Sequence, residues 1–215
     1  MYALGIILFQ VLYTIVTHRI NPKINERQHH IITGTILGGS SIIMPKRGRN
    51  CYLSMRGRDI EWLRYKATEV ESLASQDPIT IEKTNRWHSV CYPVFNEYRT
   101  KFYNSKGERR LQLEELSGMW DIALATWFGD CGKYKSGKVV LNTHIWGERG
   151  SKVIVKYFGY LDYKAEIIQE RKNFRVRLDE KSSMDFMRLV GPKLPYFFVS
   201  RQANQTGIPN YPQQS

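Results

Sequence analysis

Ile122-Ala-Leu-Ala-Thr-Trp-Phe-Gly-Asp-Cys-Gly132 is the most informative stretch of this 215-residue chain. Its small residues recur at roughly helical spacing among large apolar ones, which lets another backbone approach closely. Gly132 is a natural C-terminal stop for such a helix. Ile31-Ile-Thr-Gly-Thr-Ile-Leu-Gly-Gly-Ser-Ser41 has the same design, with Gly34 and Gly38 among branched apolar residues. We therefore expect two helices that pack against each other; two ordinary core helices remain the alternative.

These two stretches carry a family resemblance. Thr33–Ile42 and Leu124–Gly132 resemble the two motifs of a single-chain LAGLIDADG homing endonuclease. Four further segments resemble the same family, in the right order and spacing, and extend the resemblance over residues 29–201: Arg86–Phe95, Lys101–Lys106, Val139–His144 and Gly191–Pro195.

The resemblance implies an α+β fold built by pseudo-twofold duplication of an αββαββα unit. Each half would form a saddle-shaped antiparallel sheet, and the two motif helices would pair at the centre. The implied organisation is an N-terminal apolar extension and linker at 1–28, a first half at 29–106, a link at 107–120, a second half at 121–203 and a polar tail at 204–215.

Local patterns place the remaining elements. For the first half we expect a strand at Cys51–Arg56, a helix capped by Asp59 that runs through Leu73, strands at Ile79–Glu82 and Arg86–Cys91, and a helix at Pro93–Tyr103. For the second half we expect a basic turn at Lys133–Lys138, a strand at Val139–Trp146, a helix at Lys152–Tyr160, strands at Ala165–Gln169 and Phe174–Leu178, and a helix at Ser183–Val190.

One departure from the family pattern concerns metal binding. In the family, each motif helix ends in an acidic residue, and the two carboxylates hold a divalent metal at the DNA site. Here those positions fall on Gly39 and Cys131. Glycine offers no ligand, and a thiolate suits softer metals than magnesium. Asp130 is a possible substitute, but one residue on a helix turns its side chain by about 100°. We expect no intact catalytic acid, no metal and no cofactor; a magnesium site is the alternative.

The charge of the chain favours a polyanionic partner. Lys and Arg number 32 against 20 Asp and Glu, a formal net charge of +12. That balance suits nucleic acid better than a small metabolite, although a basic surface without any partner is the plain alternative.

Basic and polar residues in the expected strands and turns are the candidates for binding nucleic acid. Those on or beside strands are Arg56, Arg58, Asn142, His144, Arg175 and Arg177. Those on loops and turns are Lys46, Arg47, Arg49, Lys133, Lys135, Arg171 and Lys172. By the resemblance, Lys106 falls near a basic residue that supports the family's site, and Arg201 lies beside the matching position of the second half.

Cysteine usage and the N-terminus bear on location. Cys51, Cys91 and Cys131 have no paired spacing, so we expect free thiols in a reducing intracellular compartment. Tyr2–Val16 is apolar but shorter than the ~20 residues of a membrane span, so we expect a helix packed on the body or on a partner, with a membrane anchor as the alternative. The family suggests an organelle, the mitochondrion before the chloroplast, or a phage or prokaryotic cytoplasm.

Two functions therefore compete at the level of sequence. The first is a monomeric nucleic-acid-binding protein, with RNA favoured over DNA, that has lost cleavage. It would act as an intron maturase or within a larger ribonucleoprotein, such as an organellar ribosome, together with other proteins. The second is an active homing endonuclease that cuts both DNA strands with magnesium. A purely structural scaffold is a third possibility.

Overall fold

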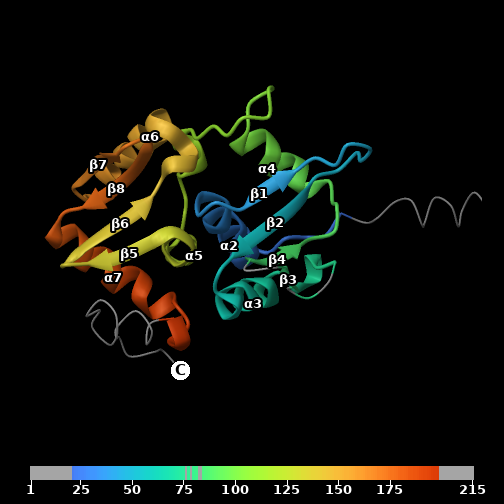
Figure 1. Ribbon diagram of the computed structural model, residues 1–215, viewed down its shortest axis with the longest axis horizontal. Coiled ribbons are helices and arrows are strands. Elements are labelled where there is room, and N and C mark those ends of the chain that lie inside the picture. The colour runs from blue at the N-terminus through green and yellow to red at the C-terminus, as the bar shows by residue number, and fades with distance from the viewer. Residues whose placement is uncertain (1–20, 76, 78, 82–83, 199–215) are drawn as a thin grey trace, which may run out of the picture.

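A computed structural model describes residues 21–75, 77, 79–81 and 84–198 of the chain. It contains two halves with the same order of elements, joined at two central helices (Figure 1). The first half consists of α2 (Glu26–Leu37), β1 (Ser41–Ile43), β2 (Tyr52–Gly57), α3 (Ile60–Glu69), β3 (Ile79–Ile81), β4 (Thr84–His88) and α4 (Val94–Phe102). The second half consists of α5 (Asp121–Cys131), β5 (Gly132–Lys135), β6 (Lys138–Asn142), α6 (Gly147–Tyr160), β7 (Ala165–Glu170), β8 (Asn173–Leu178) and α7 (Glu180–Val190). The predicted αββαββα duplication is confirmed.

Each half contains one four-stranded antiparallel sheet. The strand orders are β1-β2-β4-β3 and β5-β6-β8-β7, so equivalent strands occupy equivalent places. In the first sheet, Leu53 and Met55 of β2 are buried under the helices, whereas Arg56 is exposed. Successive side chains of a strand point to opposite faces, so Arg56 belongs to the face that the helices leave open.

The pairing of α2 with α5 depends on small residues at the helix contact. The side chain of Asn25 caps the first turn of α2. A Cβ atom on Gly34 would clash with the backbone oxygen of Ala123 and lie 2.8 Å from the Cβ of Thr126. Glycine at this position therefore lets the two backbones touch, and the two helices lie side by side in Figure 1. The expected helix pair is confirmed, as is the end of α5 at Gly132.

Helices cover the inner face of each sheet and complete the core. In the first half α3 contacts β2 and β4; in the second, α6 contacts β7 and β8. Large aromatic side chains fill the space between, and the rings of Trp127 and Phe158 stack with their centroids 5.9 Å apart. Burial of such side chains supplies most of the driving force for folding.

Several predicted boundaries were wrong. The helix capped by Asp59 ends at Glu69, and a separate 3₁₀ turn contains Leu73. The αββαββα unit implies a strand directly after the first motif helix, but the local patterns did not place β1 at Ser41–Ile43. The helix expected from Lys152 already begins at Gly147.

The second half contains two further differences. The expected basic turn 133–138 is largely strand β5, and the chain turns at Ser136 and Gly137, which both have positive φ angles. The strand predicted to reach Trp146 ends at Asn142, and His144–Trp146 forms a 3₁₀ turn. Trp146 leaves the strand because its indole nitrogen donates to the carbonyl oxygen of Leu37, 3.1 Å away in the first half.

The apolar N-terminal segment and the polar tail lie outside the described residues, so their predicted structures are untested. None of the helices in the described part of the chain has the length and hydropathy of a membrane span.

Candidate functional site

The ends of α2 and α5 meet a cavity of 640 Å³ between the two halves. Its walls include the glycines that follow α2 and residues from β5, β6 and β8. The basic side chains that line it are Arg58 from the first half and Lys133, His144 and Arg175 from the second. Asn142 lines it as well, so five of the nucleic-acid-binding residues predicted from sequence come together at one place.

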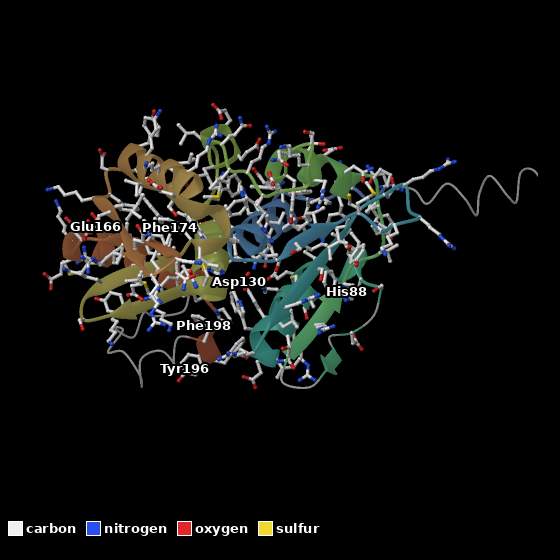
Figure 2. The ribbon with its side chains drawn as sticks, turned by 45° about the horizontal axis from the view of Figure 1, so that its top comes forward. His88, Asp130, Glu166, Phe174, Tyr196 and Phe198 are labelled. Atoms are coloured by element: carbon white, nitrogen blue, oxygen red, sulfur yellow. The ribbon has the colours of Figure 1, made fainter. Side chains whose placement is uncertain are left out.

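Asp130 lies at this junction, and Figure 2 labels it between the two halves. Its Oδ1 accepts hydrogen bonds from the indole nitrogen of Trp62 at 2.6 Å and from the ammonium of Lys66 at 2.5 Å. Its Oδ2 accepts from the hydroxyl of Thr35 at 2.9 Å. The Lys66 side chain is 1% exposed and that of Asp130 is 9% exposed, so this is a buried ion pair. The carboxylate thus points into the first half, and both of its oxygens have partners there.

The end of α2 is capped by cationic and polar groups from elsewhere. Arg109, in the link, donates to the backbone oxygen of Ile36 at 3.4 Å, in the last turn of α2. It also donates to the backbone oxygens of Gly39 at 3.2 Å and Ser40 at 2.5 Å, just beyond the helix. Carbonyls at a helix C-terminus have no partner within the helix and carry partial negative charge, so a guanidinium stabilises them. Gly39 itself has a φ of +124°, a backbone conformation that residues with side chains rarely adopt.

Arg109 was missed by sequence reasoning because its segment was interpreted as a charged link. Its location in sequence gave no sign that it reaches back to α2, since the capped carbonyls lie about 70 residues earlier. The guanidinium also lies over the rings of Tyr103 and Trp146, at 5.4 and 5.3 Å from their centroids. These contacts hold it in place.

The residues at the two helix ends do not fit magnesium. Gly39 has no side-chain ligand. Burial raises the pKa of the Cys131 thiol to about 12, which opposes formation of the thiolate, and sulfur suits softer metals than magnesium. Asp130 could bind a cation only if its ion pair with Lys66 were broken. Within the described residues, no three His, Cys, Asp or Glu side chains form a group that could hold a metal ion.

The open face of the first sheet carries two arginines opposite each other. Arg56 of β2 is the direct cross-strand neighbour of Arg86 of β4, and Ser54 is the neighbour of His88. Burial, and then the charges of Arg56 and Arg86, lower the pKa of His88. Sequence reasoning named Arg56 but missed Arg86 and His88. In the predicted strand, Arg86 and His88 flank the apolar Trp87. Because side chains two residues apart share a face, this pattern could have indicated that both lie on the open face.

The open face of the second sheet has a different charge balance. Asn142 of β6 faces Arg175 of β8, as the predicted strands would require. Arg175 forms an ion pair with Glu170 at 2.9 Å, and Arg177 forms one with Glu166 at 2.6 Å. His144 does not continue this face, because it lies in the 3₁₀ turn, where its Nδ1 is 2.8 Å from Oδ1 of Asn142.

The remaining predicted residues lie on exposed turns and on strand β5. The β1–β2 loop carries Lys46, Arg47 and Arg49, and the β7–β8 turn carries Arg171 and Lys172. Strand β5 carries Lys133 and Lys135, and the segment after α4 carries Lys106. The β1–β2 loop and the β5–β6 turn are at opposite ends of the long axis in Figure 1. The candidate surface therefore runs along the molecule with the cavity near its middle. Arg201 lies outside the described residues.

Comparison with known families identifies the chain. Residues 29–186 match the model of the LAGLIDADG DNA endonuclease family. The chain belongs to this family. The match spans both halves, including both motif helices, and confirms the resemblance drawn from the motifs.

Solved structures show where this LAGLIDADG chain keeps the family fold. The homing endonuclease I-WcaI bound to its DNA recognition sequence has a TM-score of 0.78 at 16% identity, with 84% of this chain and 88% of that chain covered. I-DmoI in complex with DNA and Ca has a TM-score of 0.54 at 9% identity, covering 81% and 96% of the two chains.

A LAGLIDADG domain of another protein is also among the similar structures. The N-terminal LAGLIDADG domain of DUF199/WhiA has a TM-score of 0.52 at 12% identity, with 82% of this chain and 88% of that chain covered. At these identities the similarity concerns the fold alone. No curated protein matches the sequence.

Proposed function

We propose that this LAGLIDADG protein binds nucleic acid across its two sheets and does not cleave it. The observation that carries the proposal is the chemistry of the two helix ends. Where the family places two metal-binding carboxylates, this chain has a bare backbone at Gly39 and a neutral thiol at Cys131. Loss of a group that carries the chemistry commonly costs on the order of 10⁴-fold or more in rate.

The charge of the central cavity supports binding without a metal. Among the described residues that line it, Asp130 is the only acidic one, and Lys66 balances its charge. Arg58 and Lys133 line the same cavity and leave it with a positive excess, while Arg175, which also lines it, is paired with Glu170. Phosphates can be held directly by Lys and Arg, with release of the counterions that the nucleic acid carried.

We further infer that RNA is the preferred partner. A surface that only binds is useful on an intron transcript or inside a ribonucleoprotein, where it holds RNA in shape. We therefore assign the chain a role as a monomeric intron maturase or as a component of a larger assembly such as an organellar ribosome, in a mitochondrion or another reducing compartment. The protein would contact the phosphates and 2′-hydroxyls of the RNA, and this binding requires no cofactor.

Crosslinking and competition test this proposal. The purified protein would be crosslinked to a mixture of cellular RNA and fragmented DNA, and the recovered nucleic acid identified. We expect RNA to be enriched and the affinity to fall steeply as salt rises. Enrichment of DNA would overturn the RNA assignment, and a flat salt profile would overturn the electrostatic account.

A matched pair of variants locates the binding surface. Lys46→Gln, Arg47→Gln and Arg49→Gln together remove three charges from the β1–β2 loop. Arg149→Gln, Lys152→Gln and Lys156→Gln remove three charges from α6, which covers the inner face of the second sheet. The loop variant should bind more weakly than the α6 variant. Equal losses would show that net charge alone drives binding.

A further inference from the structure

Two of the three cysteines lie opposite each other beyond the end of a strand pair in the first half. The antiparallel pairing of β2 with β4 continues past β4, because the backbone nitrogen of Ser89 donates to the carbonyl oxygen of Leu53 at 3.0 Å. Two residues further along each segment, the same register places Cys51 opposite Cys91.

The backbones of the two cysteine segments stay in contact where the regular pairing ends. The backbone nitrogen of Tyr92 donates to the carbonyl oxygen of Cys51 at 3.1 Å, so Cys91 and Tyr92 together oppose Cys51, as in a β-bulge. Paired antiparallel strands keep opposite Cα atoms about 4.5–5.5 Å apart, and disulfides join residues whose Cα atoms are about 4.4–6.8 Å apart. We therefore expect the backbone spacing at this place to suit a disulfide.

Both cysteines belong to the core side of the first sheet. Cys51 is buried, as is Leu53 two residues later, and Ser89 is buried two residues before Cys91. Side chains two residues apart share a face of a strand. Burial raises the pKa of the Cys51 thiol, Arg99 lowers it, and a negative charge on Cys91 raises it. The two thiols are therefore close enough for a charge on one to act on the other.

The two thiols differ in their access to solvent. Cys51 is 0% exposed, whereas Cys91 is half-buried. An oxidant therefore reaches the Cys91 sulfur first, and the enclosed Cys51 thiol lies where it can attack that sulfur and complete a disulfide. Cys131 belongs to α5 in the second half and is not part of this pair.

We propose that Cys51 and Cys91 form a reversible disulfide in the folded protein when a small disulfide such as oxidised glutathione is present. The Cys91 thiolate attacks one sulfur of oxidised glutathione, which forms a mixed disulfide and releases one glutathione. The Cys51 thiolate then attacks the Cys91 sulfur and releases the second glutathione. The protein thus loses two thiol protons and two electrons, and the oxidant takes up both as it becomes two glutathione thiols.

This disulfide would fasten one end of the β1–β2 loop. The Asn96 side chain, on α4, accepts a hydrogen bond from the backbone nitrogen of Cys51 at 2.8 Å and donates one to Oδ1 of Asn50 at 3.1 Å. These bonds already tie the end of the loop to α4, and the disulfide would add a covalent link beside them. It would also close residues 51–91, which contain β2, α3, β3 and β4, into one loop. A cross-link of this kind restricts the unfolded chain, so the oxidised protein should be more stable.

Oxidation of the folded protein tests the proposal. Reduced wild-type protein would be equilibrated at pH 8 with mixtures of oxidised and reduced glutathione, quenched in acid, alkylated in urea and digested for mass spectrometry. We expect a peptide pair linked through Cys51 and Cys91, with Cys131 recovered as an alkylated thiol, and we expect dithiothreitol to reverse the link. Recovery of Cys51 as a free thiol in every mixture, or a link from either residue to Cys131, would overturn the proposal.

Matched variants separate the disulfide from a general effect of oxidation. The urea midpoint of each protein would be compared with and without dithiothreitol after the same oxidation. Wild type and Cys131→Ala should both unfold at higher urea when oxidised, whereas Cys91→Ser should show the same midpoint in both states. An equal rise in Cys91→Ser would overturn the assignment. No rise in the wild type would mean that the fold does not accommodate the bond, and would also overturn it.

Discussion

At the scale of single residues, the Asp130 carboxylate is held in the first half by its ion pair with Lys66 and by hydrogen bonds from Trp62 and Thr35. Its place one residue before the family position indicated a side chain turned away from the metal site by about 100°. Its partners could not be predicted from the helix pattern, because Lys66 lies 64 residues away and belongs to the other half. The ion pair depends on how α3 packs beside α5, and helical periodicity does not contain that information.

Asp130→Asn should destabilise the protein strongly. Removing one partner leaves the Lys66 ammonium buried without its counter-ion, which typically costs about 3–5 kcal/mol. The free energy of unfolding, measured in urea, checks this. Asp185→Asn is the matched control, since its ion pair with Arg188 is exposed and should contribute about 0–1 kcal/mol. Similar losses in both variants would contradict the account of Asp130.

Cys131 is half-buried and lines the cavity, but its thiol should react slowly in the folded protein because little of it is ionised. Burial raises its pKa from an ordinary 9.0 to about 12, so very little thiolate is present at pH 8. Alkylation of this residue at pH 8, followed by mass spectrometry, should be far slower in the native state than in urea. Rapid native labelling would show that the thiol is accessible and ionised.

The same pKa shift predicts a change of stability with pH. A raised folded-state pKa means that this group favours the folded state fully below pH 9.0, and that its contribution is lost as pH rises from 9.0 toward 12. Cys131→Ala should therefore lose less stability over that interval than the wild type does. An identical pH dependence in the two proteins would contradict the assignment.

At the scale of elements, the motif helices were the most predictable part. The spacing of small residues was enough to predict the contact of α2 with α5, since only small side chains allow so close an approach. The conformation at the end of α2 could not be predicted, because it depends on Arg109 and Trp146, which reach it from the link and the second half. The interface residues Arg86 and His88 required the register of β2 with β4, which the pattern of one strand does not fix.

Gly34→Ala should weaken the helix pair. The new methyl group would clash with the backbone of Ala123, and overpacking of this kind typically costs about 1–3 kcal/mol. Gly159→Ala in α6 is the control, because its Cβ would meet nothing within 4 Å and alanine favours the helix. The free energy of unfolding in urea should fall for Gly34→Ala and stay equal or rise for Gly159→Ala. A Gly34→Ala protein as stable as the wild type would mean that the helices can separate without loss of stability.

At the scale of the whole molecule, the duplication is kept while the two halves have diverged in chemistry. The family motifs were sufficient to predict the fold, the two sheets and the central helix pair. The cavity between the halves could be anticipated only in part, because it combines Arg58 with Lys133 and Arg175 from distant segments. The glutamate partners of the second-sheet arginines were not predicted, although β7 and β8 form a simple hairpin in which such pairs are neighbours.

The most direct test of the account is a cleavage measurement on bound nucleic acid. The protein would be saturated with the RNA or DNA recovered by crosslinking, incubated with magnesium or manganese, and the strands analysed on a denaturing gel. We predict complete binding and intact strands with either metal. Metal-dependent cuts at a defined position, lost in a folded Asp130→Asn variant, would contradict the account and make the chain a working nuclease.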